Sequence, residues 1–537
     1  MPNIKFITIV LLLIIASSAK SQQTLNRDTL VSDFKYFISA IEETHPDPYS
    51  AYGGRVYFKK GAFDVETKLK NNDYTKDEFV SIISEFIATL GDSHTGMRVA
   101  RPKNDPNALK LPISLSTATD NLFITALPIE YEHLLGSRIV SVNNIPLKDL
   151  LEKAGEINPT ENYYGKCHYF RRKFSDYIYA GKLIPNIEPE INLELKTISG
   201  DTENILISYL TSDKYKEVKI VETDSWNKIS DDYISYQFVD KKRETMHLRM
   251  TSVMARGAFI LMDERGFSNF EMYTDYFYKT IMKCERPKDK AEAINKMPSF
   301  IEIFYNMLIE MKKNNSKNLI IDLRDNTGGF TAITSPSLYQ MFGDRYLETD
   351  MSTNYYRLIS PLYMKKIGTT LDEYNKKNES DFKFGDYAFK EKSNKKEKIE
   401  VKRKNFIEGK SYLSPVINEN DGKPLYEPKN IYVLTNDRTF SAAFHYAYYL
   451  WKMGATVVGV PSCQAPNTYM ETTPFTLPLT KLNGSISNHL QEFLPSTHRC
   501  AKTFYPEHMM NWEDYKKYSF DKHSEIKYVL DLIKKKQ

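Results

Sequence analysis

The residue types that acyl transfer requires occur in three short, widely separated motifs. A serine attacks an acyl carbon only with a base in reach, a group that orients the base, and N–H donors for the oxyanion. Ser441 is the candidate nucleophile, because it follows an apolar run that ends at Asn436 and precedes a helical run through Ala447. Unpaired N–H groups at a helix N-terminus favour negative charge, so Ala442 is one expected oxyanion donor. Serine is also a favoured helix cap, and the position alone leaves capping as the alternative.

The second motif runs from Asp322 to Gly329 and predicts a buried strand followed by a glycine turn. Ligands of open parallel sheets bind at the carboxyl ends of the strands, where this turn and Ser441 would both lie. Glycine leaves its backbone N–H accessible, so Gly328 or Gly329 is the expected second oxyanion donor. A simple left-handed turn is the alternative. The chain has neither a GxGxxG dinucleotide loop nor a Walker motif.

The third motif is the glycine-bounded turn from Gly91 to Gly96, with His94 beside Ser93. An imidazole is the usual general base because its ordinary pKa lies near neutrality. A purely structural or exposed histidine is the alternative for this turn taken alone.

The elements that must position these residues differ between the two halves of the chain. Apolar residues recur at helical spacing over 29–90, which predicts a helical N-terminal module. Short strands are expected at 111–115, 122–126 and 138–142, and alternation over 165–240 predicts antiparallel strands.

The second half has the pattern of a parallel sheet. The apolar runs at 318–323, 431–435 and 455–460 are typical of strands buried on both faces, and helical stretches separate them. This rhythm predicts right-handed βαβ units, with a further helix over 302–313. A Lys-, Asn- and Glu-rich stretch at about 365–410 is interpreted as a solvated insertion, with a basic binding patch as the alternative.

Composition limits the function classes. The chain has 537 residues, 41% hydrophobic and 26% charged, which indicates a globular protein of two to four domains. Its net charge of +4 is spread along the chain, so nucleic-acid binding gains no support. Lys5, the apolar run 6–16 and small residues up to Ser21 predict a signal peptide cleaved before Gln22. We expect export to the periplasm, cell surface or medium, without stable membrane insertion after cleavage.

Four cysteines could pair in an oxidising compartment. Cys463 with Cys500 is the favoured pairing, and four unpaired packing residues are the alternative. No spacing suggests a zinc site, and no metal is expected.

The order of the motifs along the chain resembles that of the tail-specific (C-terminal-processing) serine peptidase family. The motifs are the Ser93-His94 turn, a PDZ-like segment at 136–147, the strand with its Gly328-Gly329 turn, and Ser441. The resemblance implies a multidomain α+β and α/β protein that hydrolyses peptides or unfolded proteins without a cofactor. Its expected parts are listed in chain order: a signal peptide at 1–21, a helical N-terminal module at 22–97, a PDZ-like β-rich domain at 98–200, and a crotonase-like (ClpP-type) catalytic domain of βαβ units at 201–537. The oligomeric state is not predicted.

The family has two catalytic arrangements. One uses a lysine base about two dozen residues after the serine, but no lysine occurs between Met453 and Thr480. The other, as in the tricorn core, is a Ser-His-Ser-Glu tetrad, which Ser93-His94 matches. By this resemblance His94 takes the proton of Ser441, while Ser93 and a C-terminal glutamate orient and polarise the groups. Glu471 is the preferred glutamate, and Glu492 is the second choice.

Two departures from the family pattern indicate either altered specificity or loss of activity. Phe444 stands where many relatives have an acidic residue, and the run Ser462 to Ala465 replaces a glycine-rich loop. A catalytically silent relative that binds peptides or surfaces is therefore the second hypothesis. An esterase is disfavoured because no Gly-x-Ser-x-Gly elbow is present.

Overall fold

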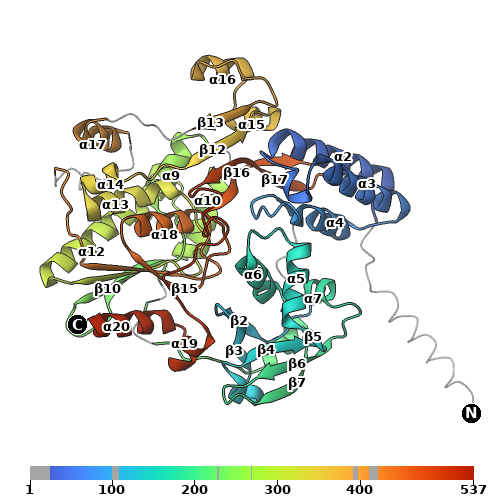
Figure 1. Cartoon of the computed structure of the whole chain (residues 1–537), viewed down its shortest axis with the longest axis horizontal. Helices are drawn as coiled ribbons and strands as arrows, with labels where there is room; N and C mark the ends of the chain where they lie inside the picture. Colours follow the sequence, from blue (N-terminus) through green and yellow to red (C-terminus); the bar gives the residue numbers. More distant parts are fainter. Residues whose placement is uncertain are drawn as a thin grey trace, which may run out of the picture. The chain divides into compact units, whose positions relative to one another are not determined.

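The computed structural model describes residues 24–98, 108–226, 229–230, 232–267, 269–390, 397–409 and 421–536 (Figure 1). The predicted signal peptide at 1–21 lies outside these residues. The chain forms two compact units: unit 1 joins Met1–Pro102, Arg357–Ala388 and Tyr469–His489, and unit 2 joins Lys103–Tyr356, Phe389–Thr468 and Leu490–Gln537. No helix in the described ranges is both long and apolar enough to cross a membrane.

Unit 1 contains the predicted N-terminal helices. They are α2 (Arg27–Thr44), α3 (Arg55–Asn71) and α4 (Lys76–Ala88), which confirms the helical start of the chain. The Thr75 side chain caps α4 in a reciprocal capping box, which satisfies N–H groups that the helix leaves unpaired. After α4 the chain turns through His94 into β1 (Gly96–Arg98), which pairs antiparallel with β17 (Asn483–Glu492).

The β17 strand belongs to a sheet whose other members come from distant parts of the chain. The order is β1-β17-β12-β13, with β16 paired to β17. The added strands are β12 (Asn354–Leu358), β13 (Tyr387–Lys390) and β16 (Asn467–Thr476). Residues from β16 and β17 complete the apolar core of the N-terminal helices, as Phe475 and Ile486 pack with Phe37 and its neighbours. The turn with His94 is therefore held by segments almost 400 residues later.

Unit 2 begins with an antiparallel sheet. Its order is β2-β3-β4-β6-β7, with β5 on β4 and β8 on β3. The strands are β2 (Ser114–Thr117), β3 (Leu122–Pro128), β4 (Arg138–Val142), β5 (Ile145–Pro146), β6 (Glu190–Lys196), β7 (Thr202–Ser208) and β8 (Ile220–Glu222).

The prediction of strands throughout 165–240 was wrong for its first part. Three helices stand there or just before: α5 (Leu147–Ile157), α6 (Tyr163–Lys173) and α7 (Tyr177–Leu183). The side chains of Asn162 and Asp176 accept N–H groups of the first turns of α6 and α7. These caps start helices that the apparent alternation of apolar residues concealed.

The second part of unit 2 is the predicted parallel sheet. Its order is β18-β15-β14-β11-β10-β9, and only the β9–β10 pairing is antiparallel among these strands. The strands are β9 (Ile234–Phe238), β10 (Thr245–Met250), β11 (Asn318–Asp322), β14 (Asn430–Thr435), β15 (Thr456–Gly459) and β18 (His508–Met509). Three apolar runs of the sequence thus became β11, β14 and β15, as predicted.

Both faces of this sheet are covered by helices (Figure 1). Alternate residues of β14 lie on opposite faces of the sheet. Ile431 and Val433 pack in a core with α12 and α18, whereas Tyr432 and Leu434 pack in a second core with α20. The covering helices include α12 (Phe300–Asn314), α13 (Ser335–Phe342), α18 (Ala442–Lys452), α19 (Trp512–Lys517) and α20 (Ser524–Lys536). Burial on two faces explains the continuous apolar runs.

Smaller helices complete the two units. They are α8 (Ser212–Glu217), α9 (Arg256–Glu264), α10 (Phe270–Tyr276), α11 (Lys290–Lys296), α14 (Asp344–Glu348), α15 (Pro361–Ile367), α16 (Leu371–Asn378) and α17 (Ile399–Glu408). The last two fall in the Lys-rich stretch at about 365–410, and neither has a buried residue.

The favoured disulfide is absent. All four cysteines are free, including Cys463 and Cys500, which are both buried. Burial and the nearby charge of Asp437 raise the pKa of the Cys463 thiol well above its usual value, which keeps it protonated and unreactive.

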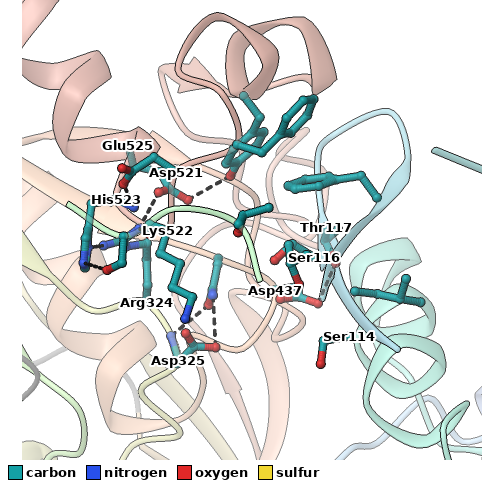
Figure 2. A pocket seen from close by; sticks show the side chains of 18 of the residues that line it. Ser114, Ser116, Thr117, Arg324, Asp325, Asp437, Asp521, Lys522, His523 and Glu525 are labelled. Carbon is teal, nitrogen blue, oxygen red and sulfur yellow. Dashed lines mark hydrogen bonds and ion pairs between the residues drawn. The ribbon is translucent and has the colours of Figure 1, made fainter. Parts of the chain in front are cut away.

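A buried charge network supports the carboxyl end of β11 (Figure 2). Arg324 donates to both carboxylate oxygens of Asp322, at 2.9 and 2.6 Å, and also binds Glu525 at the start of α20. Burial alone would raise the pKa of Asp322, but the charge and hydrogen bonds of Arg324 hold it well below its usual value. The network ties the C-terminal helix to the strand that leads into the glycine turn.

Replacing Arg324 should destabilise unit 2 strongly. In Arg324→Met the buried carboxylates of Asp322 and Glu525 lose the guanidinium that joins them, and the partly exposed Arg249 and the Tyr515 hydroxyl do not replace it. We expect a loss of about 3–5 kcal/mol in the free energy of unfolding. Arg345→Met removes an exposed pair with Glu427, and about 0–1 kcal/mol is expected. Urea unfolding followed by tryptophan fluorescence measures both. Equal midpoints for the two variants would contradict a structural role for the network.

Candidate active site

Ser441 occupies a strained position at the start of α18. Its φ and ψ are 54° and −124°, a conformation that side chains other than glycine rarely adopt. Although Ser441 is the N-cap, its side chain makes no capping hydrogen bond. Capping therefore does not account for the hydroxyl, which remains half-exposed at the carboxyl end of the parallel sheet.

The glycine turn after β11 fits directly against Ser441. A Cβ atom built on Gly328 would lie 2.7 Å from the Cβ of Ser441 and 2.8 Å from the nitrogen of Ala442. Gly328 also has a φ of +95°, so only glycine suits the position in both space and conformation.

Hydrogen bonds join this turn to the nucleophile turn. The Phe440 N–H donates to the carbonyl of Asn326 at 3.0 Å, and the Thr439 hydroxyl donates to the carbonyl of Leu323 at 2.9 Å. The turns that follow β11 and β14 are thus joined by hydrogen bonds at the carboxyl-terminal edge of the parallel sheet.

The predicted oxyanion donors differ in availability. The Gly328 N–H donates to the side-chain oxygen of Asn326 at 2.9 Å and is therefore engaged. Within the described residues, the N–H groups of Ala442 and Gly329 have no hydrogen-bond acceptor. Gly329 is fixed by its bridge to Val253, whose N–H binds the Gly328 carbonyl at 2.8 Å. Ala442 and Gly329 are consequently the better candidates for donors.

The loop after β15 also reaches the nucleophile. Ser462 donates its hydroxyl to the Thr439 carbonyl, and Gln464 accepts the Ser441 N–H through its side-chain oxygen. Sequence reasoning noted this loop as a departure from the family pattern but assigned no role to Gln464. The sequence feature that could have revealed its role is a long polar side chain in a loop where the family has glycine.

The segment just before Ser441 is held by an ion pair beside a cavity of 370 Å³ (Figure 2). Arg171 of α6 binds both carboxylate oxygens of Asp437, at 2.8 and 2.7 Å, and Thr117 of β2 donates to the same carboxylate at 2.9 Å. Although burial would raise the pKa of Asp437, Arg171 holds it below its usual value. The antiparallel sheet and α6 thereby hold the approach to the nucleophile in place.

In unit 1, the turn with His94 is built on the buried carboxylate of Asp92. This carboxylate accepts the His94 N–H at 2.9 Å, accepts the Thr95 hydroxyl, and lies 3.3 Å from the His45 ring. Burial alone raises the pKa of Asp92, but the hydrogen bond and charge of His45 bring it below its usual value. Sequence reasoning missed Asp92 and His45. Their signal was an acid two residues before the candidate base and a histidine at the end of α2.

The environment of His94 keeps its imidazole neutral. Burial lowers its pKa below the usual 6.5, although Asp92, the Tyr469 backbone and Glu471 act in the opposite direction. The His94 carbonyl accepts the Ser485 hydroxyl at 3.2 Å, which holds the backbone of the turn. A neutral imidazole is the form that can accept a proton.

The remaining predicted residues are divided between the units. Ser93 is half-buried on the turn of unit 1. Glu471 is in the same unit, exposed, at a φ of 60°, with its carboxylate 3.4 Å from Lys366. Glu492 is in unit 2 and accepts the Tyr356 hydroxyl at 2.9 Å. Of the two glutamates, only Glu471 contributes to the electrostatics of His94.

One protein-family model matches part of the chain. Residues 293–476, which include the glycine turn and Ser441, match the model of peptidase family S41. The chain carries a peptidase family S41 domain. This is the tail-specific protease family, and the protein is a serine peptidase. No curated protein matches the chain closely enough to add to this assignment.

The fold of the S41 peptidase is similar to that of solved structures of mature CPAF. One is 14% identical, with a TM-score of 0.55 over 92% of this chain and 96% of that chain. A second, mature CPAF complexed with lactacystin, is also 14% identical, with a TM-score of 0.55 over 95% of this chain and 99% of that chain. The likeness extends over nearly the whole length of both proteins and concerns the fold.

A methyl group at Gly328 should abolish peptidase activity. Because the added Cβ would displace Ser441 and the Ala442 nitrogen, we expect kcat/KM of Gly328→Ala to fall at least about 100-fold. Gly200→Ala is the matched control, since Gly200 has a φ of +97° with open space around it. Peptide hydrolysis by both purified variants separates the steric effect from backbone strain. Similar activities would show that the fit between the two turns is unimportant.

Proposed function

We propose that the S41 peptidase cleaves peptide bonds through a Ser-His-Ser-Glu tetrad formed by Ser441, His94, Ser93 and Glu471. The observation that carries this proposal is the half-buried, strained Ser441, whose side chain makes no capping bond and which lies against a glycine turn at a helix N-terminus. Oxyanion stabilisation requires such backbone donors at the nucleophile.

The reaction follows from these roles. His94 takes the proton of the Ser441 hydroxyl as its Oγ bonds to the substrate carbonyl carbon, and the carbonyl oxygen becomes an oxyanion that the N–H groups of Ala442 and Gly329 stabilise. When the oxyanion collapses, the C–N bond breaks and His94 gives the proton to the leaving amine. A water molecule, deprotonated by His94, then hydrolyses the acyl-enzyme and restores Ser441.

Glu471 and Ser93 have supporting roles in this proposal. The charge of Glu471 stabilises the imidazolium that forms when His94 accepts the proton, and its influence on the His94 pKa supports this role. Ser93 orients the groups from the same turn. The substrates we propose are peptides or unfolded proteins outside the cytoplasmic membrane, since residues 1–21 have the pattern of a signal peptide.

The test of the proposal is hydrolysis of casein and a mixed peptide library by protein beginning at Gln22. Ser441→Ala and His94→Ala should each lose several orders of magnitude in kcat, because the nucleophile and its base act as one unit. His133→Ala is a control at an exposed histidine paired with Glu203. Unchanged hydrolysis in Ser441→Ala would disprove the proposal, and a wild-type protein that binds these peptides without cutting them would favour the silent relative.

The pH dependence should identify the glutamate. The base acts when neutral, so kcat/KM rises with pH through the His94 pKa, and its lowering places this limb below pH 6.5. Glu471 raises that pKa, so Glu471→Gln should move the limb to lower pH and reduce the maximum rate. Glu492→Gln should leave the limb in place. Profiles of kcat/KM between pH 4 and 8, at roughly half-unit steps, measure the position of the limb. A shift of the limb in Glu492→Gln alone would assign the tetrad glutamate to Glu492 in place of Glu471.

A further inference from the structure

A single side chain controls the orientation of the peptide bond that precedes the nucleophile. The side-chain oxygen of Gln464 accepts the N–H of Ser441 at 2.5 Å, and Gln464 is fully buried. We propose that Gln464 is a positioning residue for Ser441, acting through this oxygen. The inference rests on the proposed function, because it concerns how the nucleophile of that mechanism is held.

The strain at Ser441 explains why a specific acceptor is needed. A positive φ at a residue with a side chain persists only when its surroundings enforce it. Two bonds from the same loop grip the backbone on either side of Phe440, because Ser462 donates to the carbonyl of Thr439 and Gln464 accepts from the N–H of Ser441. Rotation of either peptide would break one of these bonds, so the hydroxyl keeps its direction.

The loop from Ser462 to Ala465, called the gripping loop below, is itself held by hydrogen bonds within the loop and to the residues just before α6. The Gln464 N–H donates to the Ser462 hydroxyl at 3.0 Å, and the Ala465 N–H donates to the Glu161 carboxylate at 2.8 Å. Asn162 donates to the Ser462 carbonyl at 3.0 Å. Because a positioning group must be held by its own neighbours, these bonds are what the role requires.

The side-chain nitrogen of Gln464 indicates that this residue does not serve to stabilise the fold. Its nitrogen is buried without a hydrogen-bond partner among the described residues, and such an orphaned donor destabilises a fold. Turning the amide over would bring two N–H donors face to face at Ser441, so the oxygen must point there. An apolar side chain of the same length would satisfy the core better but would leave the Ser441 N–H without its acceptor.

Two substitutions separate the oxygen from the rest of the side chain. Gln464→Met keeps the length and volume but removes the acceptor, whereas Gln464→Glu keeps an oxygen that can accept the Ser441 N–H. We expect kcat of Gln464→Met to fall about 100-fold with KM unchanged and its Tm to be equal or higher. Gln464→Glu should recover kcat to within about tenfold of the wild type.

The outcomes distinguish this inference from the proposed function. If the wild type cleaves peptides and Gln464→Met keeps its kcat, or Gln464→Glu is as impaired as Gln464→Met, the positioning role is wrong. If the wild type cleaves nothing, the proposed function fails, and amide hydrogen exchange still tests the contact. The Ser441 amide should be protected in the wild type and in Gln464→Glu and exchange faster in Gln464→Met. Equal exchange in all three proteins would overturn the inference.

Discussion

The close approach of Gly328 to Ser441 is the constraint on which the candidate active site depends. Two turns that leave neighbouring parallel strands can meet this closely only if one of them has no side chain at the contact. Around this contact, the backbone of Ser441 adopts a positive φ and the Gly328 N–H donates to Asn326. The N–H groups of Ala442 and Gly329 are therefore the ones available as donors.

Stabilisation of this site comes from around it and not from the strained residues themselves. Asp437 is held by Arg171, and Asp322 by Arg324, in two buried ion pairs on the segments that lead to the nucleophile and to the glycine turn. The gripping loop is held by Glu161. These ion pairs and hydrogen bonds therefore support the segments on either side of the strained Ser441.

Sequence patterns predicted the elements whose burial is recorded in their own residues. Apolar runs identified β11, β14 and β15 because strands buried on both faces need apolar residues throughout. They failed at α6 and α7, where single caps at Asn162 and Asp176 outweigh an alternating pattern.

Some residues of the candidate site could likewise be found from the sequence, and others could not. Ser441 and the glycine turn have distinctive local sequences. Asp92 and Gln464 do not, because their roles arise from partners that tertiary structure brings together, such as His45 with Asp92 and Ser441 with Gln464. The Cys463–Cys500 pairing failed for a related reason, since spacing along the chain says little about burial of a thiol in a packed core.

The pairing of Arg324 with Glu525 joins residues 201 positions apart. A ribosome adding about 5–20 residues per second needs roughly 10–40 s to make the intervening chain. During that interval the glycine turn has been synthesised, but the carboxylate that completes the network below it has not. The buried network below the glycine turn is therefore complete only after the C-terminal helix α20 has been synthesised.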